Sequence, residues 1–249
     1  QGGKQASGPD ASSFYASSDT RLNLSAFDPL SGGVASGLEI IRYRDNQGSF
    51  QDFSAPIAFA EGFHRLDYQS RDRLGNTEVL HSTTVLVDAT HPITTAAVGL
   101  PAFTDAEGAR YIAPATPLSF SALDSQSSGV ASGVERIETG VDGAGFSTYA
   151  STFVFAEGLH SVRYRAFDRV GNTEPDRMLE LRSDGTAPTT ALEASATYYT
   201  VSGPDGTRNY APAHFTYTLP AQDPVVQSVA SGLAKTSYRI DSSQAQDYA

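Results

Sequence analysis

Carboxylates recur in this chain at the ends of alternating apolar segments. Leu22, Leu24 and Ala26 alternate with polar residues, and the next position of the same parity is Asp28. A period of two is typical of a half-buried strand, so Asp28 continues an inward-facing row of side chains. The same parity places four further carboxylates at the inward end of a predicted strand: Asp72, Asp124, Asp168 and Asp223.

The chemistry that such carboxylates could perform is cation binding. Loops that follow the second and the penultimate strand of a β-sandwich lie at the same end, so we expect Asp28 to approach Asp72 and Asp124 to approach Asp168. Two adjacent carboxylates repel each other unless they are protonated, hydrogen-bonded or bridged by a cation. Ca²⁺ binds carboxylate, amide and carbonyl oxygens at about 2.3–2.6 Å. With nearby amides and two linker acids, the predicted calcium ligands are Asp28, Asp72, Asn76, Asp88, Asp124, Asp168, Asn172, Asp184 and Asp223.

A second interpretation treats the same residues as parts of turns. Asp72 begins "DRLGNTE" and Asp168 begins "DRVGNTE". In each block the aspartate would accept hydrogen bonds from backbone N–H groups, and a glycine would supply a positive φ. The glycines expected to have this structural role are Gly75 and Gly171, together with Gly62 and Gly158 of the two "AEG" turns. Both interpretations, turn and calcium site, remain open at this point.

The elements that must position these residues belong to an internal repeat. Residues 25–41 recur as residues 121–137, and residues 59–78 recur as residues 155–174. A third copy begins near residue 208 and carries "SVASGLAKTSYRID". A fixed spacing of this kind predicts a tandem array. We therefore expect three repeats, at residues 1–90, 91–186 and 187–249, with the third incomplete at its C-terminus.

The pattern within each repeat indicates an all-β fold. Short segments of period two are separated by turn signals such as "SGG", "NQG" and "DGAG", and no segment has the pattern of an amphipathic helix. About seven strands in a repeat of this length predict an immunoglobulin-like β-sandwich. The linkers "DATHP" and "DGTAP" contain a proline, which stiffens a short connection.

The combined pattern "SGVASG … EG.H.V.YRA.DR.GNTE … D.TAP.T" resembles the tandem bacterial Ig-like repeats of large surface and secreted proteins. One branch of that group is named after a leptospiral outer-membrane protein, and other members are attached to secreted glycosidases. The resemblance covers nearly the whole chain. The resemblance implies an extracellular or cell-surface location in a bacterium. It does not imply one particular activity, because such modules serve as spacers, stalks and adhesive units.

Composition excludes several classes of function. With 28 acidic and 17 basic residues the net charge is −11, which argues against a nucleic-acid partner. No apolar run is long enough for insertion into a membrane. Cysteine is absent, so disulfides and thiolate metal sites do not contribute. No G-x-S-x-G elbow is present, and we nominate no catalytic residue and expect no enzyme activity.

The function predicted from the sequence is a structural or adhesive segment of an extracellular Ig-like array, such as a stalk, fibre or surface filament. Its expected partners are neighbouring Ig-like repeats and copies of the same protein. Two alternatives stay open: a module that binds a glycan or protein ligand through its loops, and the accessory part of a larger secreted enzyme.

Overall fold

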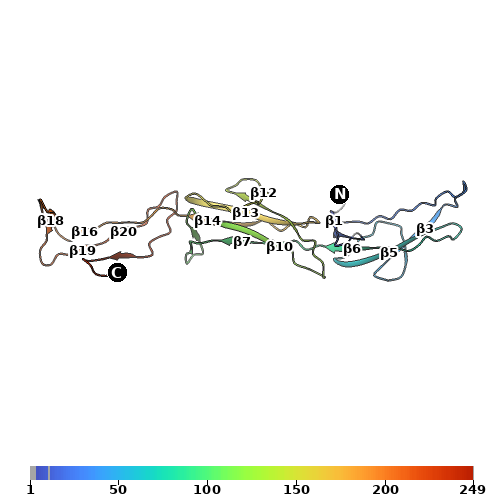
Figure 1. Cartoon of the computed structure of the whole chain (residues 1–249), viewed down its shortest axis with the longest axis horizontal. Helices are drawn as coiled ribbons and strands as arrows, with labels where there is room; N and C mark the ends of the chain where they lie inside the picture. Colours follow the sequence, from blue (N-terminus) through green and yellow to red (C-terminus); the bar gives the residue numbers. More distant parts are fainter. Residues whose placement is uncertain (1–3, 11, 249) are drawn as a thin grey trace. The chain divides into compact units, whose positions relative to one another are not determined.

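The computed structural model describes residues 4–10 and 12–248, which form strands, turns and loops (Figure 1). The predicted fold class, tandem immunoglobulin-like β-sandwich repeats, is confirmed by the strand topology given below. Within the described part of the chain, no helix is long and apolar enough to cross a membrane.

The chain divides into two compact units. The first comprises Gln1–Ala97, Ser119–Thr152 and Val162–Leu179, and the second comprises Val98–Leu118, Phe153–Ser161 and Glu180–Ala249. The linker at residues 88–92 therefore lies inside the first unit, and the linker at residues 184–188 lies inside the second. The repeat boundaries at residues 1–90, 91–186 and 187–249 stay predictions.

Repeat 1 is built on a six-stranded sheet with the order β1-β2-β6-β5-β3-β4. Strand β2 pairs with β6 in parallel, whereas β5 pairs with β3 and β6 in the antiparallel sense. Alternating apolar residues of β2 and β6 form the core, where Ala16, Val85 and Val87 are buried. The strands are β1 (Gln5–Ser7), β2 (Ser13–Ser17), β3 (Leu38–Asp45), β4 (Gln51–Asp52), β5 (Gly62–Asp72) and β6 (His81–Asp88).

The expected second strand of repeat 1 is formed only in part. Leu22, Leu24 and Ala26 are less exposed than the residues between them, as the period of two predicts. Residues 22–27 nevertheless make only one ladder pair, between Leu22 and Ile57, and no described segment pairs along their other edge. A strand needs a hydrogen-bonded neighbour, so burial alternates here without a regular ladder.

Repeat 2 has the two sheets of an immunoglobulin-like sandwich. One sheet has the order β12-β11-β13-β14-β9-β8, and the other pairs β10 with β7. Phe120 of β10 packs against Tyr164 of β13, with ring centroids 4.9 Å apart, and so links the layers. The strands are β7 (Ile93–Val98), β8 (Ala102–Thr104), β9 (Arg110–Ile112), β10 (Leu118–Leu123), β11 (Val134–Val141), β12 (Ser147–Thr148), β13 (Gly158–Asp168) and β14 (Arg177–Ser183).

The described part of repeat 3 consists of short antiparallel pairs: β15 with β20, β16 with β19, β17 with β18, and β21 with β22. Within it, no strand takes the place that β14 has beside β9 in repeat 2. The strands are β15 (Thr189–Thr190), β16 (Glu193–Ala194), β17 (Tyr199–Gly203), β18 (Gly206–Tyr210), β19 (Tyr217–Thr218), β20 (Ala221–Gln222), β21 (Thr236–Tyr238) and β22 (Gln246–Tyr248).

Candidate metal centre

Asp168 stands at the end of β13 and organises the turn that follows. Its Oδ1 atom accepts hydrogen bonds from the backbone N–H groups of Val170, Gly171 and Asn172, at 3.0, 2.6 and 2.8 Å. Its Oδ2 atom accepts a bond from Asn172 Nδ2 at 2.7 Å. Gly171 has a φ of 94°, which favours glycine. The side chain of Asp168 is fully buried beneath this turn.

Asp72 organises the equivalent turn of repeat 1. Its Oδ1 atom accepts bonds from the N–H groups of Leu74 and Asn76, and Gly75 has a φ of 90°. The hydrogen bond from the Asn76 side chain holds the pKa of Asp72 below its ordinary value. Both DRxGN blocks therefore have the geometry of aspartate-capped turns.

Asp124 directly follows β10 and caps the next loop. Its Oδ2 atom accepts a bond from Gly133 N at 2.7 Å, whereas its buried Oδ1 atom has no hydrogen-bond partner. The same arrangement occurs in the other repeats, where Asp28 accepts from Gly37 N and Asp223 accepts from Gly232 N. Each of these aspartates accepts a charged hydrogen bond from the glycine nine positions later in the chain, and such a bond is stronger than a neutral one.

Asp88 brings a third carboxylate to the site from the linker. It is the last residue of β6, its side chain is fully buried, and its Oδ1 atom accepts a bond from Thr90 N. Its Oδ2 atom accepts a bond of 2.6 Å from Ser132 N, in the loop that Asp124 closes. The carbonyl oxygen of Asp88 accepts a bond of 2.9 Å from Asn172 Nδ2. The linker is thus attached to both loops of repeat 2.

Asp88, Asp124 and Asp168 form the only group of three metal-ligating side chains found among the described residues. Each offers one carboxylate oxygen, and the three oxygens lie within 4.8 Å of one another. Burial raises the pKa of Asp124, and the charges of Asp88 and Asp168 add to this effect. Burial also raises the pKa of Asp168, again with a contribution from the charge of Asp88. Three negative charges at this distance require protons or a cation for balance.

The other predicted ligands form smaller groups. Ser231 connects Asp184 and Asp223 at the second linker, since its N–H group donates to Asp184 Oδ2 at 2.7 Å and its hydroxyl group contacts Asp223 Oδ2 at 3.5 Å. Burial opposes ionisation of Asp184, but hydrogen bonds with Ser231, Thr186 and Asp223 together outweigh it and lower the pKa. In repeat 1, Ser36 hydrogen-bonds to both Asp28 and Asp72. Within the described part of the chain, neither group includes a third carboxylate.

The two asparagines contribute nitrogen rather than oxygen. Asn76 Nδ2 donates to Asp72, and Asn172 Nδ2 donates to Asp168 and to the Asp88 carbonyl. This differs from their expected role as oxygen ligands. The physical reason is that each turn places its aspartate within reach of the amide, and a carboxylate attracts the donor end.

Sequence reasoning missed the glutamates that hold the linkers. Glu61 Oε1 accepts a bond of 2.7 Å from Thr90 Oγ1, and Glu157 Oε1 accepts one of 2.6 Å from Thr186 Oγ1. Gly62 and Gly158, which follow these glutamates, have φ values of 129° and 137°. The recurrence of "AEG" together with a threonine two residues after the linker aspartate was the available signal.

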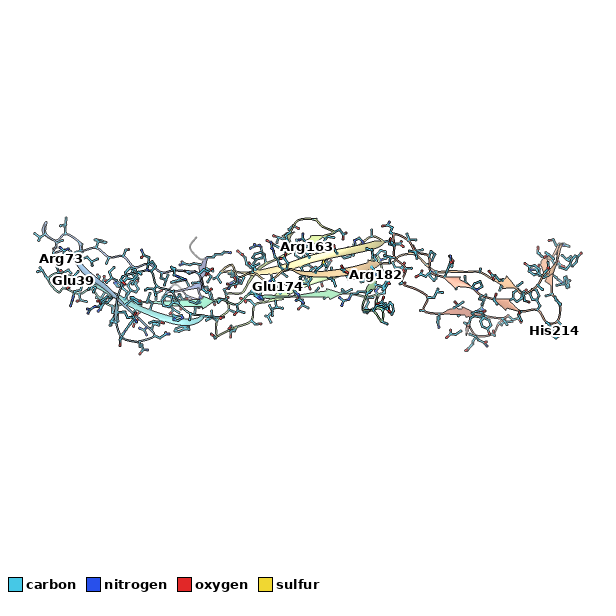
Figure 2. The ribbon with its side chains drawn as sticks, turned by 180° about the vertical axis from the view of Figure 1, so that it is seen from behind. Glu39, Arg73, Arg163, Glu174, Arg182 and His214 are labelled. Atoms are coloured by element: carbon cyan, nitrogen blue, oxygen red, sulfur yellow. The ribbon has the colours of Figure 1, made fainter. Side chains whose placement is uncertain are left out.

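Glu174, the last residue of "GNTE", was also missed. It is 3% exposed and accepts bonds from Thr94 N at 2.9 Å, from the Thr94 hydroxyl group and from Ala166 N at 3.1 Å. Figure 2 labels Glu174 in repeat 2. The glutamate therefore fixes strand β7 to the end of β13, directly after the linker.

Comparisons with known proteins give limited information. No protein-family description matches the chain, and no curated protein matches it. Among solved structures, the fibronectin(III)-like modules of Clostridium thermocellum CbhA are 16% identical, with a TM-score of 0.34 over 66% of this chain and 83% of that chain. A tetra-tandem repeat in the extending region of a large adhesion protein is 16% identical, with a TM-score of 0.28 over 72% of this chain and 57% of that chain. Both TM-scores lie below 0.5, so the fold assignment stands on the strand topology of the chain itself.

Proposed function

We propose that this chain is a non-catalytic segment of an extracellular array of Ig-like repeats, with a structural or adhesive role, and that Ca²⁺ stiffens the joint formed by Asp88, Asp124 and Asp168. The observation that carries the proposal is the attachment of the Asp88 carboxylate to the loop of the following repeat, beside two further carboxylates.

The donor set favours Ca²⁺ among the common cations. All three side chains present oxygen, which hard cations prefer, and no histidine or cysteine belongs to the group. The buried Oδ1 atom of Asp124 has no protein partner and is available as a ligand. Burial is the main reason for the raised pKa values of Asp124 and Asp168, and a bound dication would also remove the charge repulsion that adds to it.

Attachment of the linkers supports a stiff array. At the first joint Asp88 is bonded to Ser132 and Asn172, while Thr90 is bonded to Glu61. At the second joint Asp184 is bonded to Ser231, and Thr186 is bonded to Glu157. Both linkers thus bond to the repeat on each side, and repeat arrays gain stability from such neighbour contacts. The resemblance to bacterial Ig-like surface repeats supports the extracellular location.

Calcium titration of the full chain tests the proposal. Isothermal titration calorimetry after removal of metals with EDTA should give one tight site per chain, and thermal unfolding should shift upward in millimolar Ca²⁺. The variant Asp168→Ala should lose both effects. The matched variant Asp72→Ala removes the equivalent carboxylate of repeat 1 and should retain both. A chain that binds no Ca²⁺, or an Asp168→Ala variant that binds it unchanged, would refute the calcium assignment.

One observation favours a second function, the binding of a glycan or protein ligand. Hairpin β17–β18 exposes aromatic side chains, with Tyr199 72% exposed and Tyr210 56% exposed. Tyrosine is common at binding surfaces because it has a large apolar ring and a polar end. Glycan-array binding by the full chain that is lost in Tyr199→Ala would support this function, and array binding unaffected by the variant would exclude the hairpin.

A further inference from the structure

One face of repeat 1 repeats a surface that is buried in repeat 2. We define this acceptor face by Val34, Ser36, Leu74, Asn76 and Glu78, together with the edge of residues 22–28. Its counterparts in repeat 2 are Val130, Ser132, Val170, Asn172 and Glu174, together with β10, as the aligned sequence blocks show. Figure 2 labels Arg73, which precedes Leu74 in the sequence, and Glu174 of repeat 2.

Exposure separates the two faces clearly. Val130 and Val170 of repeat 2 are 3% and 2% exposed, whereas Val34 and Leu74 of repeat 1 are 73% and 81% exposed. The side chain of Glu174 is 3% exposed, and that of Glu78 is 40% exposed. Val229, the counterpart of Val34 in repeat 3, is 1% exposed. The apolar surface is thus buried in repeat 2, buried at Val229 in repeat 3 and open in repeat 1, which indicates a contact surface.

In repeat 2, residues 88–98 are bonded to this surface. Asp88 bonds to Ser132 N, the carbonyl oxygen of Asp88 bonds to Asn172, and Thr94 bonds to Glu174 through its N–H and hydroxyl groups. Strand β7 then pairs with β10. In repeat 3 the corresponding linker begins in the same way, with Asp184 bonded to Ser231 N.

The groups that hold this segment are all present on repeat 1. Ser36 N and Asn76 stand where Ser132 N and Asn172 stand. Within the described part of the chain, Asn76 Nδ2 is bonded to Asp72 alone. Glu78 Oε1 accepts a bond from Ser70 N, as Glu174 Oε2 does from Ala166 N. A cleft lined by Asp28, Ser70, Asp72, Asn76 and Glu78 crosses the face. The edge of residues 22–27 has one ladder pair, to Ile57.

We infer that the acceptor face of repeat 1 binds an extended segment of the form Asp-x-Thr-x-Pro-x-Thr from a further Ig-like repeat. Both linkers of this chain have that form, with Asp88 and Thr94 in one and Asp184 and Thr190 in the other. The aspartate would bond to Ser36 N, a carbonyl oxygen would accept from Asn76, and the second threonine would bond to Glu78. The residues that follow would pair with the edge of residues 22–27.

The inference rests on the proposed role as an array segment but not on calcium. An aspartate seated on Ser36 N would lie beside Asp28 and Asp72, which share the Ser36 hydroxyl group. The occupied face would then contain three carboxylates, as the joint of Asp88, Asp124 and Asp168 does. Binding of the segment to the acceptor face can be measured in EDTA as well as in Ca²⁺. Failure of the calcium assignment is therefore distinguishable from failure of the segment to bind.

The experiment places a copy of Val87–Ala97 directly ahead of Gln1 in the full chain. Gln5 pairs with Ala16 in repeat 1 as Ala102 pairs with Ile112 in repeat 2. In the extended chain Gln5 follows the copied Ala97 at the same distance as Ala102 follows Ala97, so the copy has the register of the original. Amide hydrogen exchange at residues 22–28 and at Ser36 should slow at least tenfold, toward the rates at residues 118–124 and Ser132. Asp88→Asn and Thr94→Val within the added copy alone should return most of the original exchange.

Two results would overturn the inference. One is unchanged exchange at residues 22–28 and Ser36 in both EDTA and Ca²⁺, with residues 118–134 still protected as evidence that the chain is folded. The other is protection of the acceptor face in the unextended chain that increases with protein concentration, which would assign the face to contacts between copies.

Discussion

Replacement of Asp124 by asparagine changes the balance of charge at the first joint while keeping the shape of the side chain. Asp124 is the member of the cluster with a buried oxygen that lacks a partner, and the charges of Asp88 and Asp168 raise its pKa. The asparagine oxygen can still accept from Gly133 N, and its amide group can donate to Asp88. Asp124→Asn therefore removes two repulsive pairs and replaces a charged calcium ligand by a neutral one, which binds the ion more weakly.

The magnitude follows from the oxygen separation of at most 4.8 Å. A pair of unit charges at that distance costs about 1 kcal/mol in bulk water and about 3 kcal/mol at an effective dielectric constant of about 20. The charged hydrogen bond to Gly133 becomes a neutral one, which offsets about 1 kcal/mol. In EDTA at pH 7 we expect Asp124→Asn to stabilise the chain by at least about 1 kcal/mol, or about 2–4 °C in the unfolding temperature.

In Ca²⁺ we expect the unmodified protein to be more stable than Asp124→Asn, the reverse of the order in EDTA. A ligand at about 100 times its dissociation constant stabilises the folded state by about 2.7 kcal/mol, which corresponds to about 5–10 °C for a chain of this size. The unmodified protein should gain that shift, and Asp124→Asn should gain little. Differential scanning calorimetry in EDTA and in millimolar Ca²⁺ measures both quantities, with Asp28→Asn as the matched change in repeat 1. Destabilisation by Asp124→Asn in EDTA, or an undiminished calcium shift, would refute the reasoning.

Three further predictions follow from the same geometry. The folded chain holds protons on Asp124 and Asp168 at pH values where the unfolded chain has released them, because the ordinary pKa of an aspartate is 3.8. In urea unfolding in EDTA, the free energy of unfolding should therefore fall as the pH rises from about 4 through the raised pKa values, and Ca²⁺ should reduce this dependence. A free energy of unfolding that rises with pH in this range would contradict the prediction. Glu174→Ala removes the carboxylate that accepts from Thr94 N and Ala166 N, and should lower the free energy of unfolding by about 2–4 kcal/mol. The matched change Glu78→Ala, at an exposed side chain, should lower it by about 1 kcal/mol or less. Equal losses in urea unfolding would show that burial of Glu174 is irrelevant. Gly171→Ala puts a Cβ atom at a φ of 94° and should cost about 1–2 kcal/mol, whereas Gly145→Ala, which has no positive φ and no neighbour within 4 Å, should be neutral or slightly stabilising in the same assay.

The alternation of apolar and polar residues along the strands predicted the positions of several carboxylates of the candidate site. The parity of Leu118, Phe120 and Ala122 placed Asp124 at the inward end of β10, and the structure has it there beside Asp168. This works because the side-chain period of a strand is fixed by backbone geometry. The position of Asp88 followed from the proximity of a linker to the loops of the next repeat. The roles of Gly75 and Gly171 were accessible for a similar reason, since a tight turn restricts φ locally.

The contacts that the sequence did not predict depend on the pairing of distant segments. Nothing local distinguishes Glu174, buried against Thr94, from Glu78, which lies in the same motif and is exposed. Likewise, the amide of Asn172 points its nitrogen at Asp168 and the Asp88 carbonyl because of groups 4 and 84 residues away. Residues 22–27 have the composition of a strand but only one ladder pair, since the ladder depends on a neighbouring segment.

The parallel pairing of β2 with β6 has a mechanical consequence. Ser13 to Ser17 of β2 lie opposite Thr84 to Asp88 of β6, so the second and the last strand of repeat 1 run side by side in the same direction. A force that pulls the two ends of the repeat apart slides these strands past each other and loads the hydrogen bonds between them together rather than one after another. The corresponding pairing of β9 with β14 in repeat 2 covers two residue pairs, Arg182 with Tyr111 and Ser183 with Ile112. Under tension, repeat 1 therefore has the longer clamp, and its last residue is the carboxylate of Asp88 that anchors the next repeat.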